Sequence, residues 1–504
     1  MFRTALVILA LLLSAPVQAQ DSVWSRFSAA AIRAGAESLE RADSLLADLH
    51  LRARADREIL AAAEWLSRRG SHPGERIEMA AAIAGAWVEA GHEDEALRVL
   101  AGVSLEVDRI PTKATKNRAL YELGRAWAGA GAMDEVEAIA AALPRPDTML
   151  AELGARQGEA GDLAAARALA TRVTDPTARG KILGRSARAS VKAGDQDEAL
   201  AILEEITDLN WRASVIQAVA VAKAEAGDCP GGRAVADRLR GVPGIEPKTI
   251  DLSGGLARRS RHPLVMAKVA AACARGGDPD EALRIAATLP PGRRQVEAIA
   301  GIAVTVKDDA RARELLKDAQ GRAGEISKPG VQALALIALA TAWTERGETD
   351  KAIAILDTAW EASRKPKKPG LGDGRFTILA DLAAAGRCED ASRRARTIAA
   401  SFWRDGALAA ATRGCAAAGE TAKALDLAAA VRTPLWAANA YQEVALARLK
   451  AGDIAAALDA AARVPSKRGR VKALAAVGAA HLKAGGASSS ELSAALSRLL
   501  VDRD

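Results

Sequence analysis

The sequence predicts an all-α protein, a solenoid of about twelve stacked helix–turn–helix repeats. Three observations carry this prediction: a glycine recurs at a near-constant spacing, a helix end and a helix start flank that glycine, and the composition is that of packed helices. Hydrophobic residues make up 50% of the 504 residues and aromatic residues only 3%. Most of the apolar residues are Ala and Leu, without the alternation that is typical of strands.

The recurring glycine marks one turn in each repeat. Gly161, Gly194 and Gly227 lie 33 residues apart, and the same interval separates the last four glycines of the series. Because glycine adopts the left-handed backbone conformation without steric cost, each of them can end a helix. The series is Gly91, Gly131, Gly161, Gly194, Gly227, Gly277, Gly347, Gly386, Gly419, Gly452 and Gly485, with Lys307 in the slot between Gly277 and Gly347.

A residue that can cap a new helix follows many of these turns. The caps, each one residue past the turn position, are Asp162, Asp195, Asp228, Asp278, Asp308 and Asp453. The stretch after Gly277 adds Pro279 at the first helical position, and Glu281 where it can reach back to the cap. Each turn is therefore predicted to end one helix and to begin the next, which makes the unit a helical hairpin.

Small residues are predicted to let the two helices of a hairpin approach closely. Most of the residues seven positions before the turn are small: Ala84, Gly124, Gly154, Ala187, Ala220, Ala270, Ala300, Ala340, Ala445 and Gly478. Alanine recurs five positions after it, at Ala96, Ala166, Ala199, Ala282, Ala312, Ala352, Ala391, Ala424 and Ala457. A bulky ring recurs four positions before it, at Trp87, Trp127 and Trp343, where we expect a core residue.

This arrangement resembles the tetratricopeptide repeat family over residues 75–500. One complete example is Ala340, Trp343, Gly347 and Ala352. The second helix differs from the family pattern, since it carries Ala or Leu where the family prefers a bulky aromatic residue. The resemblance implies a right-handed superhelical solenoid whose first helices line a concave face, and family members generally hold a peptide or a partner protein on that face.

The two ends and two irregular stretches complete the predicted domain organisation. Residues 1–19 have a charged start, an apolar run and small residues before Ala19, which predicts a signal peptide that is cleaved after Ala19. Residues 20–74 are expected to form an N-terminal helical cap, and residues 75–500 the solenoid. The solenoid is interrupted by an insertion at 241–265, whose extra residues lie around 241–255, and by a basic linker at 363–375. We therefore expect a periplasmic or secreted protein without stable membrane insertion.

The four cysteines fall into two pairs with the same offsets. Cys229 and Cys388 each lie two residues past a turn glycine, and Cys273 and Cys415 each lie four residues before the next one. Adjacent helices of a stack would bring the members of each pair together, so the spacing predicts the disulfides Cys229–Cys273 and Cys388–Cys415. The alternative is four buried free thiols that pack as small hydrophobic residues.

Charge and motifs favour no catalytic, metal or nucleic-acid chemistry. The net charge of +7 falls to +6 when the signal peptide with Arg3 is removed, which is weak for a chain of this length, and aromatic rings for base stacking are few. The five histidines, His50, His72, His92, His262 and His481, are scattered and form no metal-ligand spacing. We expect no cofactor and no enzymatic activity.

Basic residues of the first helices are the candidate partner-binding residues, and three of them, Arg125, Arg188 and Arg413, stand six residues before their turn glycine. The full set is Arg118, Arg125, Lys181, Arg188, Arg294, Arg413 and Lys472. The leading interpretation is an exported adaptor that binds a protein or peptide partner of the cell envelope. The alternative is a helical platform or accessory subunit of a peptidoglycan enzyme, similar to the superhelical part of lytic transglycosylases.

Overall fold

A computed structural model describes residues 51, 54–55, 58–240, 261–364 and 374–501. Within these residues every regular element is an α-helix except one short 3₁₀ helix, η2 (Leu105–Arg109). The fold is therefore all-α, as the composition and the repeat spacing predict. Among the described helices, none combines the length and the apolar character that a membrane crossing requires.

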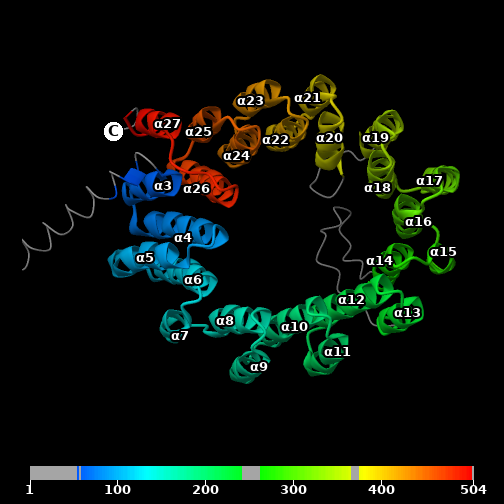
Figure 1. Cartoon of the computed structure of the whole chain (residues 1–504), viewed down its shortest axis with the longest axis horizontal. Helices are drawn as coiled ribbons and strands as arrows, with labels where there is room; N and C mark the ends of the chain where they lie inside the picture. The colour runs from blue at the N-terminus through cyan, green and yellow to red at the C-terminus, as the bar shows by residue number, and fades with distance from the viewer. Residues whose placement is uncertain (1–50, 52–53, 56–57, 241–260, 365–373, 502–504) are drawn as a thin grey trace, which may run out of the picture.

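The helices form two concentric layers of a closed ring (Figure 1). The inner layer contains the first helix of each hairpin: α4 (Pro73–Glu89), α6 (Lys113–Gly129), α8 (Asp147–Glu159), α10 (Pro176–Lys192), α12 (Leu209–Glu225), α14 (His262–Arg275), α16 (Arg293–Thr305), α18 (Pro329–Glu345), α20 (Arg375–Ala384), α22 (Ser401–Ala417), α24 (Pro434–Lys450) and α26 (Lys467–Lys483). The outer layer contains the second helices: α5 (Glu93–Ser104), α7 (Met133–Ala142), α9 (Leu163–Arg172), α11 (Gln196–Glu205), α13 (Cys229–Asp237), α15 (Pro279–Ala287), α17 (Asp309–Gly324), α19 (Thr349–Arg364), α21 (Cys388–Arg396), α23 (Thr421–Ala430) and α25 (Ile454–Ala462).

The turns between the layers form as the sequence predicts. All eleven turn glycines have a positive φ, between 73° and 100°. All six predicted aspartate caps accept a backbone N–H of the following helix, at 2.8 to 2.9 Å. The slot of Lys307 has no glycine and needs none, because α16 ends in extended backbone at Val306, with φ −67° and ψ 126°.

One detail of the capping prediction is wrong. Glu281 pairs with Arg284 at 2.7 Å instead of returning to the N–H of Asp278. That N–H donates to the carbonyl oxygen of Cys273 at 3.0 Å, because the left-handed residue at Gly277 turns the chain back over the end of α14. The cap donor is thus satisfied by the preceding helix.

The predicted small residues and rings form the core between the layers. Ala84 and Ala96 are 1% and 0% exposed, and Trp87, Trp127 and Trp343 are all buried. The glycines of this series are tightly packed against the next repeat. A Cβ atom on Gly154 would lie 2.9 Å from two side-chain carbons of Ile182, which shows that the backbone of α8 is in contact with α10.

The first helix with described bounds, α3 (Ile59–Arg68), closes the ring. It packs against both α26 and α4, and α26 packs against α4 as each inner helix packs against the next around most of the ring. In this way α3 occupies the outer-layer place beside α26, although it lies at the opposite end of the sequence (Figure 1). The last helix, α27 (Ser490–Val501), packs against α25 and α3.

Several predicted segments lie outside the described residues. They are the signal peptide at 1–19, most of the helical cap at 20–74, residues 241–260 of the insertion at 241–265, and residues 365–373 of the linker at 363–375. The described part of the expected cap contains α3. The described edges of the two irregular stretches belong to α14, α19 and α20.

Candidate functional site

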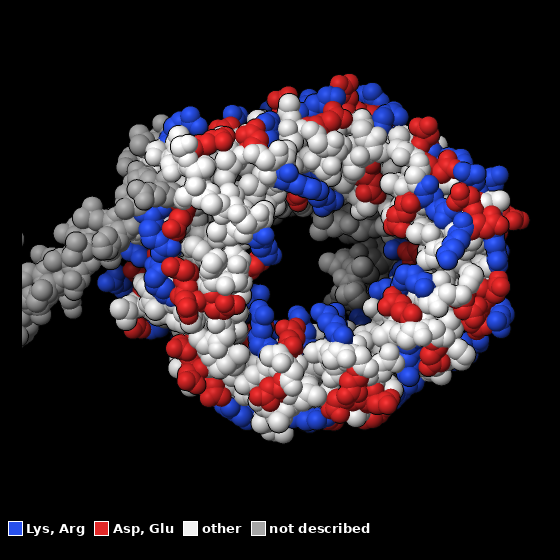
Figure 2. Space-filling model, viewed as in Figure 1, with Lys and Arg blue, Asp and Glu red and all other residues white. Residues whose placement is uncertain are grey.

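The inner helices surround an opening at the centre of the ring (Figure 2). Each inner helix is covered on one side by an outer helix, and around most of the ring its flanks pack against neighbouring inner helices. Exposed side chains in its middle turns therefore face the opening. Figure 2 shows that Lys and Arg side chains project into the opening from several directions.

All seven candidate residues lie on inner helices. Arg118 and Arg125 are on α6, and Lys181 and Arg188 are on α10. Lys472 is on α26, which the ring closure brings next to α4. These five residues thus belong to one arc of consecutive inner helices, α26, α4, α6, α8 and α10. The other two candidates, Arg294 on α16 and Arg413 on α22, lie on the remainder of the ring.

Charges alternate between the helices of this arc. Glu78 of α4 lies between Arg118 of α6, at 3.0 Å, and Arg468 of α26, at 2.5 Å. In the same manner, Glu152 of α8 pairs with Lys181 of α10 and, at 3.9 Å, with Arg125 of α6. Each carboxylate is therefore shared by cations from its two neighbouring helices, which links the five helices by charge as well as by packing.

The two signs of charge differ in exposure. Outside the first and last four residues of the described inner helices, every charged residue that is exposed is Arg or Lys, whereas the Asp and Glu residues are half-buried or buried. The side chains of Arg118 and Arg125 are 67% and 61% exposed, against 16% for Glu78 and 24% for Glu152. The exposed cations are Arg118, Arg125, Arg185, Arg188, Lys268, Arg413 and Lys472.

We call Arg118, Arg125, Arg185, Arg188 and Lys472 the basic arc. Within the described part of the chain, Arg188 and Lys472 form no ion pair. Their charges are available to an anionic ligand, because no carboxylate has to be displaced first. Sequence reasoning missed Arg185 and also Arg468. It missed the carboxylates as well, although Glu78 stands thirteen residues before its turn glycine, the same position as Arg118, Lys181 and Lys472.

The remainder of the ring is less charged and contains two perturbed groups. Burial and the nearby guanidinium of Arg294 lower the pKa of Lys268, and Glu297 partly offsets this effect. Arg294 itself pairs with Glu297 at 2.8 Å. Burial raises the pKa of Asp381 at the end of α20, and the positive charge of Arg413 partly offsets that effect. Neither Lys268 nor Asp381 has a neighbour set typical of acid–base chemistry.

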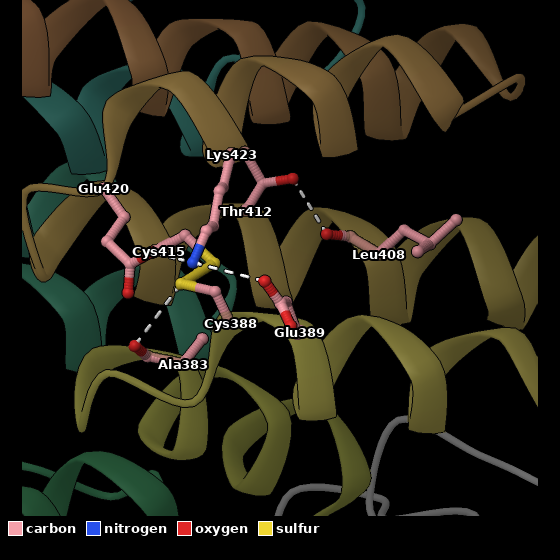
Figure 3. The surroundings of a disulfide bond; sticks show 8 residues. All are labelled: Ala383, Cys388, Glu389, Leu408, Thr412, Cys415, Glu420 and Lys423. Atoms are coloured by element: carbon pink, nitrogen blue, oxygen red, sulfur yellow. Dashed lines mark hydrogen bonds and ion pairs between the residues drawn. A yellow bond between two sulfur atoms is a disulfide. The ribbon is translucent and has the colours of Figure 1, made fainter.

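The cysteines are brought together in the predicted pairs, and Figure 3 shows the pair Cys388–Cys415. Cys229 pairs with Cys273 and Cys388 pairs with Cys415, each with a Cα–Cα distance of 5.5 Å, which is within the range that a disulfide spans. Each pair joins the first residue of an outer helix to the next inner helix. Beside the second pair, Lys423 contacts Glu420 at 2.7 Å and Glu389 at 3.5 Å, and so adds an ionic link between α21 and α23.

No metal centre is found in the described parts of the chain, where no three or more His, Cys, Asp or Glu side chains gather. His481 stands four residues before Gly485, in the slot that Trp87, Trp127 and Trp343 fill in other repeats. Its Nε2 and the Nε1 of Trp87 are both buried and have no hydrogen-bond partner among the described residues, and both residues line a cavity of about 70 Å³ at the ring closure. Gly486 lies against the imidazole, so closely that a Cβ atom there would overlap it.

Comparisons with known proteins place this chain in no family. No model of a protein family matches it, and a search of curated proteins finds no relative. The similar solved structures are distant. Ton1535 from Thermococcus onnurineus NA1 is 14% identical over 72% of this chain and 97% of its own, with a TM-score of 0.25. The pentatricopeptide repeat protein PPR10 from maize is 15% identical over 100% and 78%, with a TM-score of 0.30.

A further solved structure is a circular tandem repeat protein with 13% identity, covering 87% of this chain and 98% of its own, with a TM-score of 0.15. Scores of this size support no argument about function. What the protein does must therefore be inferred from its own residues and their arrangement.

Proposed function

We propose that the protein is an exported, periplasmic scaffold without enzymatic activity, which holds a protein or peptide partner of the cell envelope on the inner face of its ring. The observation that carries this proposal is that the exposed charged residues in the middle turns of the described inner helices are Arg and Lys, whereas the Asp and Glu residues there are half-buried or buried. A concave surface whose exposed charges are of one sign attracts a partner of the opposite sign.

The location of the seven candidate residues supports the same proposal. All of them lie on the inner layer, where a partner would be surrounded by several repeats at once. Repeat proteins use such extended concave surfaces for binding, because neighbouring repeats present side chains in register. The paired cysteines and the predicted signal peptide at 1–19 favour an oxidising compartment outside the cytoplasm.

The test is partner capture by cross-linking and mass spectrometry in the native cells. The variant replaces Arg125, Arg188 and Arg413 with Ala, and the matched control replaces three exposed cations of outer helices, Lys317, Arg396 and Arg498. We expect the inner variant to lose partners that the wild type and the control retain. Identical partner lists for all three proteins would refute the inner-face site.

The compartment and the alternative function are tested separately. N-terminal sequencing of the mature protein should begin at Gln20, and fractionation should find the protein in the periplasm. A pull-down with purified peptidoglycan addresses the enzyme-platform alternative. Retention on peptidoglycan together with capture of a cell-wall hydrolase would favour that alternative over the adaptor.

A further inference from the structure

We propose that the bound segment of the partner is an acidic polypeptide that lies along the basic arc, across the helices α26, α4, α6, α8 and α10. This inference rests on the proposed function and names the chemistry of its partner. It follows from three features of the arc: the excess of exposed cations, the shielding of the carboxylates, and the lack of exposed aromatic rings.

The five helices of the basic arc present positive charge to the opening, although they also carry acidic residues. Glu78 and Glu152 are each shared by two cations and are only 16% and 24% exposed. Glu122 of α6 is 40% exposed, which is less than the 61% of Arg125 that lies 3.9 Å from it. Arg188 and Lys472 are exposed and form no ion pair with a described residue. A ligand that approaches from the opening therefore meets guanidinium and ammonium groups first, and a carboxylate on the ligand gains attraction from several of them.

The same alternation favours a polypeptide over a nucleic acid. A nucleic-acid backbone carries a charge at every nucleotide, so some of its phosphates would lie against Glu78 and Glu152. On the five helices, Trp87 and Trp127 are buried, and Tyr121 is half-buried with its hydroxyl donated to the carbonyl oxygen of Arg145 at 3.0 Å. The described residues of these helices therefore offer no row of exposed rings on which successive bases could stack. A peptide places its acidic side chains at variable intervals, so it can match the cations and avoid the carboxylates.

The arc exists only because the ring is closed. Lys472 is on the last inner helix, and Arg118 is on the second, at the same position of its repeat. The ion pair between Arg468 and Glu78 joins α26 to α4 between them. An acidic segment that contacts both Lys472 and Arg118 therefore bridges the junction of the two chain ends, and its binding should depend on ring closure.

The experiment measures binding of a fluorescein-labelled oligoglutamate peptide to the full-length mature protein by fluorescence anisotropy. Oligoglutamine of the same length is the uncharged probe, and a single-stranded oligothymidylate is the nucleic-acid probe. We expect the protein to prefer oligoglutamate to both, and we expect the affinity to fall as salt is added.

Two variants of the inner helices test the proposal: one should weaken oligoglutamate binding and the other should strengthen it. Arg188→Gln with Lys472→Gln should weaken oligoglutamate binding by roughly two- to fivefold per residue, as for exposed ion pairs. Lys317→Gln with Arg498→Gln on α17 and α27 is the matched control and should leave the affinity unchanged. Glu152→Gln should strengthen binding by a similar factor, because it releases Lys181 and leaves Arg125 with Glu122 as its remaining carboxylate neighbour, and a gain of affinity cannot arise from misfolding.

Each outcome decides between stated alternatives. Weaker binding in the double variant and tighter binding in Glu152→Gln support the proposal. Oligoglutamate binding that is absent, or that responds equally to the arc and control variants, overturns it, and so does an oligothymidylate affinity above that for oligoglutamate. If cell-envelope partners are captured through the inner face but oligoglutamate does not bind, the acidic-segment inference fails and the proposed function stands. If no partner is captured, the proposed function fails.

Discussion

Leu60 of α3 packs onto Gly478 of α26, so closely that a Cβ atom on the glycine would lie 2.5 Å from Cδ2 of the leucine. Leu60 is 1% exposed, and the two residues stand near opposite ends of the chain. The same junction contains an ion pair between Lys483 and Glu89 at 2.6 Å. An apolar contact with polar links at its rim therefore joins the first described helix of the protein to its last inner helix and makes the solenoid a ring.

Truncation of the closing side chain should open this junction. Leu60→Ala removes a buried leucine that the surrounding helices cannot replace, at a cost of about 2–5 kcal/mol. In a stack of repeats the loss falls mainly on the affected interface, since each repeat contacts only its neighbours. We expect faster amide hydrogen exchange in α3 and a larger maximum dimension by small-angle X-ray scattering.

The control for this prediction is Leu105→Ala in η2, where the leucine is 79% exposed. That change should alter stability by no more than about 0.5 kcal/mol and leave the exchange of α3 unchanged. If α3 in Leu60→Ala exchanges as slowly as in the wild type, the packing of Leu60 does not hold the ring closed.

Replacement of a turn glycine by alanine should destabilise the protein, whereas the same replacement inside a helix should stabilise it. Gly194 has a φ of 87°, so Gly194→Ala forces an L-residue into the left-handed region, at a cost of roughly 1–2 kcal/mol. Gly321 lies inside α17 with no atom within 4 Å of an added Cβ, so Gly321→Ala should gain about 0.5–1 kcal/mol. Thermal unfolding of both variants measures the difference, and a shift of the same sign in both would contradict the explanation.

These glycines show why so much of the fold follows from the sequence. The conformation of Gly194 and the cap at Asp195 are set by residues a few positions away, so a local pattern predicts them. The closure of the ring leaves no such pattern. Leu60 is one apolar residue among many, and Gly478 occupies the same small-residue slot as Gly154, so only the summed curvature of the whole stack brings the two together.

The candidate site, like the fold, follows from the sequence only in part. The position of Arg118 on an inner helix follows from its distance to Gly131, which the sequence displays. That Arg118 shares Glu78 with Arg468 does not follow, because the shared carboxylate requires α26 to lie beside α4. The exposure of each charge also depends on its neighbours, so the excess of exposed cations became visible only in the packed ring.

Asp381 gives the protein a predicted pH dependence. Burial raises the pKa of this carboxyl group in the folded protein, so the folded state binds the proton more tightly than the unfolded state. Its contribution to stability therefore increases as the pH falls through the folded-state pKa, and is complete below the unfolded value of about 3.9. At neutral pH the buried charge destabilises α20.

Asp381→Asn removes that charge and should raise the melting temperature at pH 7. The gain should shrink as the pH is lowered, because the wild-type carboxyl group becomes neutral as well. Asp350→Asn, at an exposed position of α19, is the control and should not raise the melting temperature. A gain in Asp381→Asn that is as large at pH 3 as at pH 7 would show that ionisation is not its cause.

The two cysteine pairs should be disulfides in the mature protein. After denaturation without reductant, an alkylating reagent should modify no cysteine, and after reduction it should modify all four. The pairs close segments of 44 and 27 residues, for which chain-entropy arguments give about 3–4 kcal/mol of stabilisation each. The Cys229–Cys273 pair spans the interval that contains the predicted insertion, so it ties α13 to α14 where the chain between them is longest.

Separate replacement of the pairs shows whether this stabilisation is local. Cys388→Ser with Cys415→Ser should increase hydrogen exchange in α21 and α22, and Cys229→Ser with Cys273→Ser should do so in α13 and α14, each variant leaving the other region protected. Because repeats contact only their neighbours, a lost crosslink should not propagate around the ring. Four thiols that react without reductant would show that the pairs are buried free cysteines, and reduction would then leave the melting temperature unchanged.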